Sequence, residues 1–296
     1  MKTAVFIDGT GCSRGSGTNI ERLADAVDAG AGQEVVYCPG PGMRFGTLIL
    51  GKVFGNDVGG IVLSCARRLH CSMREHGADE LYLFGFSRGA FAARLLADFA
   101  ARGALSLHPR RMAAAWRSYV AAANDRVSPP QFTMSAVPAI RFLGVFDSVD
   151  SVPTIRSAHL EHLPAAAAAA ARHAVAIDEH RPLFNCIPFA KDPRVEEVFF
   201  PGSHSDIGGG YADNREIADL TLRWMAEGAS RAGLAFKKGS IPDRAFDPAK
   251  AMIHDSSRDA SNAFGLPRKF MRRIDPARIH PSAAEIAKVQ GRRTDG

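Results

Sequence analysis

A single stretch, residues 80–101, limits the folds open to this chain more than any other part of the sequence. It opens with the apolar run Leu81-Tyr82-Leu83-Phe84, which is typical of a buried strand. It closes with an alanine-rich segment from 90 to 101, which is typical of a helix. Between the two lies Gly85-Phe86-Ser87-Arg88-Gly89, a G-x-S-x-G pattern. A strand, a tight turn and a helix in this order form the context in which the pattern carries a nucleophilic serine.

The physical requirements of such a turn account for the residues around Ser87. Glycine at positions 85 and 89 lets the strand and the helix approach each other without a clash between Cβ atoms. The backbone N–H of Arg88 would lie at the N-terminus of the helix, where it faces any oxyanion that forms beside the serine. The alternative is a plain turn flanked by glycines, because the pattern on its own is common by chance.

Strands and helices alternate along most of the chain. We expect strands at 3–7, 34–37, 81–84, 139–146 and 195–200. We expect helices at 18–28, 56–76, 90–101, 109–124, 158–176 and 215–232, and the fifth of these is predicted from the alanine tract at 165–171. The alternation predicts an α/β fold with a mostly parallel sheet and helices on both faces.

Three of the predicted strands are followed directly by residues suited to acyl transfer. Ser87, Asp147 and His204 each come after an apolar strand, and open parallel sheets bind ligands at the carboxyl ends of their strands. Their order in the chain is that of the α/β-hydrolases. Ser87 would attack an acyl carbonyl, His204 would take and return its proton, and Asp147 would fix the imidazole and stabilise its charged form. Other candidates for the acid are Asp150, Asp178 and Asp206.

The turn after the first strand adds further candidates. Its backbone N–H groups at Gly9 and Thr10 would supply the second half of an oxyanion hole, opposite Arg88. Asp8 in the same turn could instead be a phosphatase nucleophile. That chemistry normally uses two aspartates flanking one residue, and the first of these positions is Phe6.

Asp206 and His254 are accessory candidates, together with Asp8. Asp206 lies two residues after His204, where it could steer that histidine, bind a cation or cap the helix after the glycine run at 208–210. His254 is the one serious rival to His204 as the base, and otherwise it could line or gate the pocket.

Composition narrows the class of protein. Of the 296 residues, 46% are hydrophobic and 23% are charged, as in ordinary globular domains. No apolar run of about 18 residues occurs, so we expect no transmembrane helix, and the N-terminal apolar run is too short for a signal peptide. The five cysteines contain no C-x-x-C pair, which argues against a disulfide framework and a zinc site. We expect a protein that is cytoplasmic where it is made and that uses no metal or other cofactor.

Positive charge is concentrated at the C-terminal end. Residues 237–296 contain 13 Lys or Arg and 7 Asp or Glu, whereas the charges balance over residues 1–236. One interpretation is contact with an anionic partner such as a membrane surface, and the other is a solvated tail. No nucleic-acid-binding motif is found, so we expect no nucleic-acid partner. We therefore divide the chain into a catalytic core at 1–236 and a basic C-terminal extension at 237–296 that packs on the core or trails from it.

Five motifs carry a family resemblance. They are Phe6-Ile7-Asp8-Gly9-Thr10, Gly85-Phe86-Ser87-Arg88-Gly89-Ala90-Phe91-x-x-Arg94, Gly144-Val145-Phe146-Asp147-Ser148-Val149, Asp178-Glu179-x-Arg181 and Pro201-Gly202-x-His204-x-Asp206-Ile207-Gly208-Gly209-Gly210-Tyr211. Together they resemble the α/β-hydrolase family that contains the type VI secretion phospholipase effectors, the first Tle lipase family. The resemblance implies a Ser87–Asp147–His204 triad, ester hydrolysis with phospholipids as the best-known substrates, export by a type VI secretion system, and an immunity or secretion-apparatus protein as a partner.

The hypothesis from sequence is a serine esterase with an α/β-hydrolase fold that cleaves esters of phospholipids or other lipids through an acyl-enzyme on Ser87. Its substrate would be a lipid or a small ester, with transient membrane-surface contact through the basic C-terminal region. Three alternatives stay open: a non-lipid carboxylesterase or thioesterase, a catalytically inactive binding module with a basic tail, and a phosphatase that uses Asp8.

Overall fold

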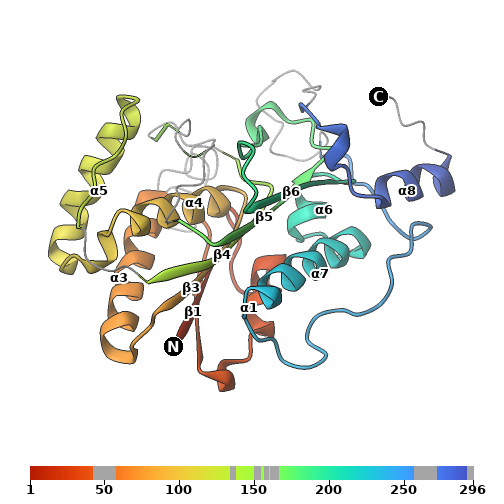
Figure 1. The fold of residues 1–296 in the computed structure, drawn as a ribbon. Coiled ribbons are helices and arrows are strands. Elements are labelled where there is room, and N and C mark those ends of the chain that lie inside the picture. Colours follow the sequence, from red (N-terminus) through yellow and green to blue (C-terminus); the bar gives the residue numbers. More distant parts are fainter. Residues whose placement is uncertain are drawn as a thin grey trace.

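The described residues form a six-stranded sheet whose neighbouring strands are all parallel (Figure 1). This computed structural model describes residues 1–42, 58–133, 138–149, 155–156, 160, 167–256 and 272–291. The strand order is β2-β1-β3-β4-β5-β6. The strands are β1 (Lys2–Ile7), β2 (Gln33–Cys38), β3 (Glu80–Phe86), β4 (Ala139–Phe146), β5 (Ala170–Ala176) and β6 (Val195–Phe200).

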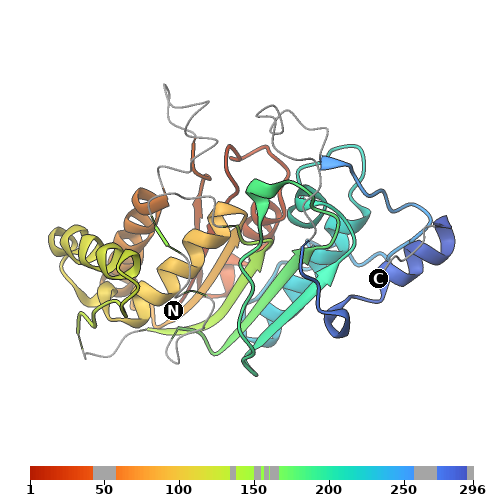
Figure 2. The ribbon, with the colours of Figure 1, turned by 90° about the horizontal axis from the view of Figure 1, so that it is seen from above.

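Helices cover both faces of this sheet, as Figure 2 shows from above. One face carries α3 (Val58–His76), α4 (Arg88–Ala101) and α5 (Pro109–Asn124), and the other carries α1 (Asn19–Ala26), α6 (His204–Gly208) and α7 (Glu216–Arg231). A further helix, α8 (Ser282–Gln290), lies near the β6 edge (Figure 1), and short 3-10 turns occur at Ala29–Ala31, Ala104–Ser106, Pro182–Phe184 and Pro276–Arg278. The predicted α/β fold is confirmed. Across the described ranges, no helix combines the length and apolarity that a bilayer crossing requires.

Side chains of the central strands alternate between two cores. Ile7 and Leu83 pack toward α3 and α4, whereas Phe6 and Phe84 pack toward α1 and α7 and stack on each other with ring centroids 4.7 Å apart. A strand that is buried on both faces has no polar side, which is why these strands read as continuous apolar runs in the sequence.

The helix predicted at 158–176 is wrong where the structure describes it, because Ala170–Ala176 is the strand β5. Alanine favours a helix locally, but this segment lies between β4 and β6 and its backbone pairs with both. Two side-chain contacts with β6 also fix it, an ion pair of Arg172 with Glu196 at 2.7 Å and a hydrogen bond between His173 and Glu197 at 2.9 Å. Residues 157–159 and 161–166 of the predicted helix lie outside the described residues. The other predicted strands and helices are found within a few residues of their expected bounds.

The order of strands fixes where a ligand can bind. β1 has β2 on one side and β3 on the other, so the chain changes its winding direction between β1 and β3. In open α/β sheets, ligands bind at the carboxyl ends of such a pair of strands. Residues 8–17 follow β1, and Ser87 follows β3.

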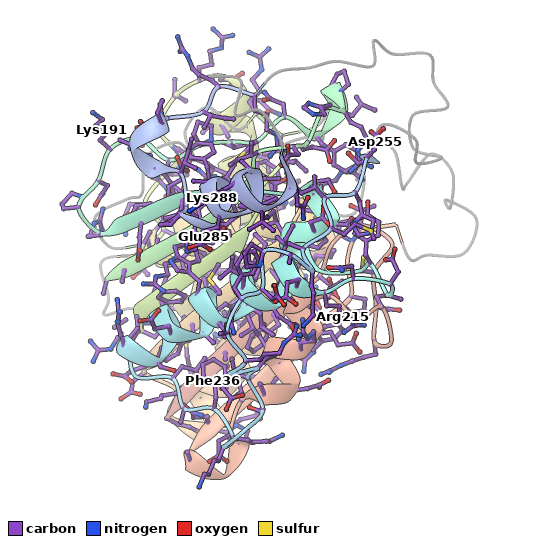
Figure 3. The ribbon with its side chains drawn as sticks, turned by 90° about the vertical axis from the view of Figure 1, so that its right-hand side faces the viewer. Lys191, Arg215, Phe236, Asp255, Glu285 and Lys288 are labelled. Atoms are coloured by element: carbon purple, nitrogen blue, oxygen red, sulfur yellow. The ribbon has the colours of Figure 1, made fainter. Side chains whose placement is uncertain are left out.

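Described parts of the predicted C-terminal extension pack on the core. The backbone of Lys237 donates to Ala26, and Ile279 forms a bridge with Phe199 at the outer strand β6. Ile286 of α8 is buried in the core on the α7 side. Figure 3 shows this side of the molecule, with Glu285 and Lys288 on α8 in front of the sheet. A domain boundary at residue 237 stays a prediction.

Candidate active site

Ser87 is the single residue between β3 and α4. Its backbone angles are φ 60° and ψ −128°, a left-handed conformation that non-glycine residues rarely adopt. Such a conformation costs about 1–3 kcal/mol and has to be held by its surroundings. Here the N–H of Ser87 donates to Phe146 O at the end of β4, at 3.0 Å. The tight turn between strand and helix that the sequence predicts is confirmed.

The flanking glycines are required by close backbone packing. A Cβ atom on Gly85 would lie 2.4 Å from Gly89 O, within the turn itself. A Cβ atom on Gly89 would lie 2.2 Å from Asp8 O and 2.4 Å from Ile7 O, both in the backbone at the end of β1. These contacts are shorter than real Cβ atoms make. The predicted reason is therefore confirmed for Gly85, whereas Gly89 makes room for the end of β1 and not for β3.

Asp147 and His204 are joined by a hydrogen bond of 2.6 Å between Oδ2 and Nδ1. Asp147 follows β4 directly and is fully buried, and its Oδ1 accepts the N–H of Ala176 at 3.0 Å. His204 is the first residue of α6, and the rings of Phe86 and Phe184 pack against it with centroids 4.6 and 4.9 Å away. Phe86 is the residue before Ser87. The structure thus brings Ser87, Asp147 and His204 to the carboxyl ends of β3, β4 and β6.

The protonation states of this pair suit a neutral base. Burial lowers the pKa of His204, and the opposing effect of the Asp147 carboxylate is not enough to restore it. Burial alone would raise the pKa of Asp147, but the Arg272 guanidinium and the bond to His204 hold it well below its usual range. At neutral pH, His204 is therefore uncharged and Asp147 is ionised.

Asp8 anchors the loop after β1. Its fully buried carboxylate accepts three bonds, from Gly9 N at 2.8 Å, Thr18 Oγ1 at 2.8 Å and Tyr37 Oη at 2.6 Å. Burial raises the pKa of Asp8, against the effect of these bonds. A carboxylate with both oxygens occupied in this way is poorly placed to attack a phosphoryl group. The geometry therefore argues against the phosphatase alternative.

The same bonds correct one predicted oxyanion donor. The N–H of Gly9 donates to Asp8 Oδ1, so Gly9 cannot also donate to an oxyanion in this conformation. Thr10 is left as the candidate donor from this loop. The side chain of Arg88 donates from Nη1 to Thr10 Oγ1 at 2.9 Å and links the loop to the turn that carries Ser87. The sequence suggested a role only for the backbone of Arg88.

Asp206 and His254 form a second acid–histidine pair. Asp206 accepts the N–H of Ser203 at 2.8 Å and so caps α6, the helix to which it belongs, and not the helix after the glycine run. Its Oδ1 also bonds His254 Nδ1 at 2.6 Å, while His254 Nε2 lies 3.2 Å from both carboxylate oxygens of Asp213. His254 is therefore held by two carboxylates of its own, Asp206 and Asp213, whereas Asp147 is bonded to His204. This arrangement disfavours His254 as the base.

Sequence reasoning missed two groups that support His204. Glu179 accepts the backbone N–H of His204 at 3.2 Å, the Ser256 hydroxyl at 3.0 Å and Arg181 Nη2 at 2.8 Å. Its motif was visible in the sequence, but nothing there indicated this function. The second group is Arg272, which lies against Asp147 and comes from a region without a recognisable pattern.

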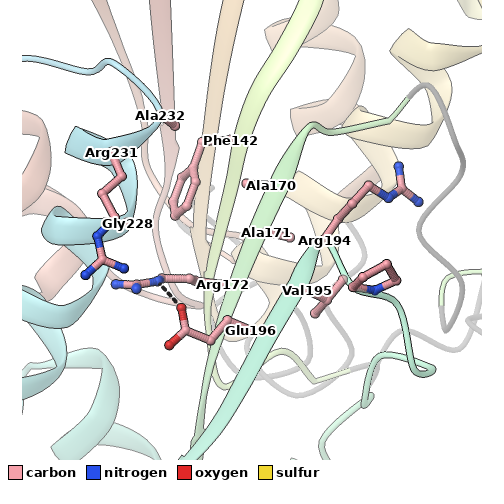
Figure 4. Close-up of a pocket in the computed structure, with 11 residues that line it drawn as sticks. Phe142, Ala170, Ala171, Arg172, Arg194, Val195, Glu196, Gly228, Arg231 and Ala232 are labelled. Atoms are coloured by element: carbon pink, nitrogen blue, oxygen red, sulfur yellow. Dashed lines mark hydrogen bonds and ion pairs between the residues drawn. The ribbon is translucent and has the colours of Figure 1, made fainter.

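A separate pocket of about 480 Å³ lies at the amino ends of β5 and β6 (Figure 4). Arg172, Arg194 and Arg231 line it, and Arg172 Nε donates to Glu196 Oε2 at 2.7 Å. It lies at the opposite edge of the sheet from Ser87, and none of the candidate site residues lines it. In the ranges that the structure describes, no cluster of three His, Cys, Asp or Glu side chains is placed to hold a metal ion.

Residues 2–228 match the family described as type VI secretion system phospholipase effector Tle1-like, catalytic domain. In curated proteins, a stretch of 55 residues is 46% identical to the uncharacterized protein YEL023C of Saccharomyces cerevisiae. That stretch covers 17% of this chain and 8% of the yeast protein.

Two solved structures are similar in fold. An uncharacterized protein from Pseudomonas aeruginosa has a TM-score of 0.56 and 17% identity, over 80% of this chain and 46% of that one. The Tle1 effector bound to the VgrG spike of the type 6 secretion system has a TM-score of 0.50 and 18% identity, over 100% of this chain and 81% of that one. At these identities the likeness shows the fold alone, and this chain spans less than half of the Pseudomonas protein.

Proposed function

Because this chain belongs to the Tle1-like catalytic-domain family of type VI secretion phospholipase effectors, we propose that it is a serine hydrolase acting on lipid esters. It would cleave carboxylic esters of phospholipids or other lipids through an acyl-enzyme on Ser87. The observation that carries the proposal is the strained Ser87, which lies at the same sheet edge as the Asp147–His204 pair. Strain of this kind is held at functional sites because it aims a side chain at a substrate.

Each side chain then has a defined task in the proposed mechanism. His204 Nδ1 is bonded to Asp147, so Nε2 takes the proton as Ser87 Oγ attacks the ester carbonyl. The N–H groups of Arg88, at the positive end of α4, and of Thr10 stabilise the oxyanion. The imidazolium returns its proton to the leaving alcohol. Water activated by His204 then hydrolyses the acyl-enzyme and frees the carboxylic acid.

The proposed partners are a lipid substrate and a protein of the secretion apparatus, with export by a type VI secretion system. The family supports both, and the structurally similar Tle1 effector is bound to a VgrG spike. Contact between the basic C-terminal region and a membrane surface is weaker as a proposal. Three described arginines of that region, Arg244, Arg272 and Arg278, form ion pairs with carboxylates of residues 1–236 and so are partly neutralised.

The test compares Ser87→Ala with Ser118→Ala, a control at an exposed helical serine. Purified proteins are treated with a fluorophosphonate probe and with a panel of phospholipids and p-nitrophenyl esters, and products are identified by mass spectrometry. We expect labelling and hydrolysis in the wild type and in Ser118→Ala, and neither in Ser87→Ala. Unchanged hydrolysis in Ser87→Ala would refute the proposal. A wild type that no probe labels would favour the inactive binding module, and activity on simple esters alone would favour a non-lipid esterase.

A further inference from the structure

The guanidinium of Arg272 lies against the carboxylate of Asp147, 125 positions earlier in the chain. Nη2 donates to Asp147 Oδ2 at 3.0 Å and Nη1 donates to Oδ1, so both carboxylate oxygens are engaged. The same two nitrogens also donate to the carbonyls of Ala176, at 3.0 Å, and Phe184. The Arg272 side chain is 3% exposed and that of Asp147 is 0% exposed. This is a buried, two-pronged ion pair directly behind the Asp147–His204 bond.

We propose that Arg272 is a positioning residue of the hydrolytic site, supplied by the C-terminal segment and acting on His204 through Asp147. The inference rests on the proposed function, because it assigns Arg272 to that same site. It also extends the site beyond residues 2–228, the part of the chain that matches the family.

The first effect of Arg272 is on the orientation of the carboxylate. Oδ2 of Asp147 bonds both His204 Nδ1 and Arg272, while Oδ1 bonds the N–H of Ala176 and Arg272. A planar guanidinium fork matches a planar carboxylate and restricts its rotation. The carboxylate is therefore locked with Oδ2 toward the imidazole. A lysine would retain the charge at this position but not the fork.

The second effect is on charge. An ionised carboxylate in a dry site attracts a proton strongly to a neighbouring imidazole, and a cation beside it weakens that attraction. The other charged groups that face His204 are Glu179 and Arg181, which form an ion pair with each other at 2.8 Å. The nearby Cys186 thiol stays neutral, because burial raises its pKa. Arg272 is thus the cation that balances Asp147, and by weakening the pull of that carboxylate it adds to the burial that keeps His204 neutral.

The C-terminal segment is anchored where Arg272 enters the site. Arg278 donates from Nη1 to Glu197 Oε1 at 2.9 Å, and the N–H of His280 donates to Phe199 O at 2.8 Å. Both contacts attach the segment to β6, the strand that precedes His204. The segment is therefore held to the same strand that positions the base.

The test compares Arg272→Met and Arg272→Lys with Arg273→Met, a control at the exposed neighbouring arginine. The first readout is the pH dependence of kcat/KM for a soluble ester. In Arg272→Met we expect the acid limb to move up by about one pH unit or more, since removing the cation favours protonation of the Asp147–His204 pair. We also expect kcat to fall at least tenfold with little change in KM. Arg272→Lys should show a smaller shift of the limb, and Arg273→Met none.

The second readout does not depend on hydrolysis. The imidazole of His204 is titrated by NMR in Ser87→Ala protein with and without each Arg272 substitution, with its signal assigned by His204→Gln. A higher pKa of His204 in Arg272→Met supports the inference even if no ester is hydrolysed. Absence of hydrolysis in the wild type would then refute only the proposed function. If Arg272→Met lowers stability but moves neither the limb nor this pKa, Arg272 is merely structural and the inference is overturned. Should Arg272→Met not fold, the same two readouts on Arg272→Lys decide.

Discussion

Replacing Gly89 with alanine tests the backbone packing on which the position of Ser87 depends. The added Cβ would lie 2.2 Å from Asp8 O, and real Cβ contacts essentially never fall below 3.0 Å. Helix α4 and the end of β1 would therefore have to separate by roughly 0.8 Å. Overpacking of this kind costs about 1–3 kcal/mol, and alanine returns about 1 kcal/mol through its higher helix propensity. We expect a net loss of up to about 2 kcal/mol in the free energy of unfolding.

The functional effect of Gly89→Ala should exceed the effect on stability. A net loss of that size lowers Tm by at most about 8 °C in a chain of this length. A displacement of the serine turn by nearly 1 Å should reduce kcat/KM by about 100-fold, because attack geometry tolerates little error. Thermal unfolding and ester hydrolysis measure the two effects, with Gly30→Ala as a control whose nearest neighbour is a side-chain atom at 3.2 Å. Wild-type Tm and kcat/KM in Gly89→Ala would refute the packing argument.

Two further predictions concern Asp8, which anchors the loop after β1, and His254, which is held by Asp206 and Asp213. Asp8→Ala should lower Tm, since it removes the acceptor of the Tyr37 and Thr18 hydroxyls and each buried group left unsatisfied costs about 1–3 kcal/mol. Tyr37→Phe should lower Tm less, and an unchanged Tm in Asp8→Ala would contradict the anchoring role. Burial alone would lower the pKa of His254. The hydrogen bonds of its ring to the carboxylates of Asp206 and Asp213 outweigh burial, so the pKa of His254 is raised. The stabilisation from His254 is then complete below about pH 6.5 and is lost as pH rises through the raised pKa. The difference in Tm between wild type and His254→Gln should accordingly be largest at acid pH and shrink above neutrality, and a difference that grows with pH would reverse the assignment.

Local patterns were enough to predict most of the fold. β3, the turn at Ser87 and α4 follow one another in sequence, so their apolar run, glycines and alanines report directly on their structure. The meeting of Asp147 and His204 could be anticipated too, because Asp147 comes directly after an apolar strand, His204 follows another by four residues, and parallel strands end at one edge. Their catalytic roles, with that of Ser87, stay proposals.

Features that depend on distant contacts were missed. The alanines of β5 favour a helix on their own, and only pairing with β4 and β6 makes them a strand. A local contact was missed as well, since Gly9 was expected to face an oxyanion but its N–H donates to the carboxylate of Asp8, the residue before it. Arg272 is one of many arginines in a region without periodicity, and its contact with Asp147 spans 125 residues. No local pattern encodes such a contact.

The distance between Ser87 and the loop after β1 is set by the spacing of the strands that precede them. β1 and β3 are hydrogen-bonded neighbours with Ile7 level with Gly85, so the chain continues from each strand at nearly the same height. Adjacent strands lie about 4.8 Å apart, so the two backbones start at that separation on either side of the substrate carbonyl. Insertions beyond Cys12 should leave the distance between Ser87 and Thr10 unchanged, whereas one residue added between Ile7 and Thr10 would change it. Loop length in relatives should therefore vary on the far side of this short segment and be constant within it.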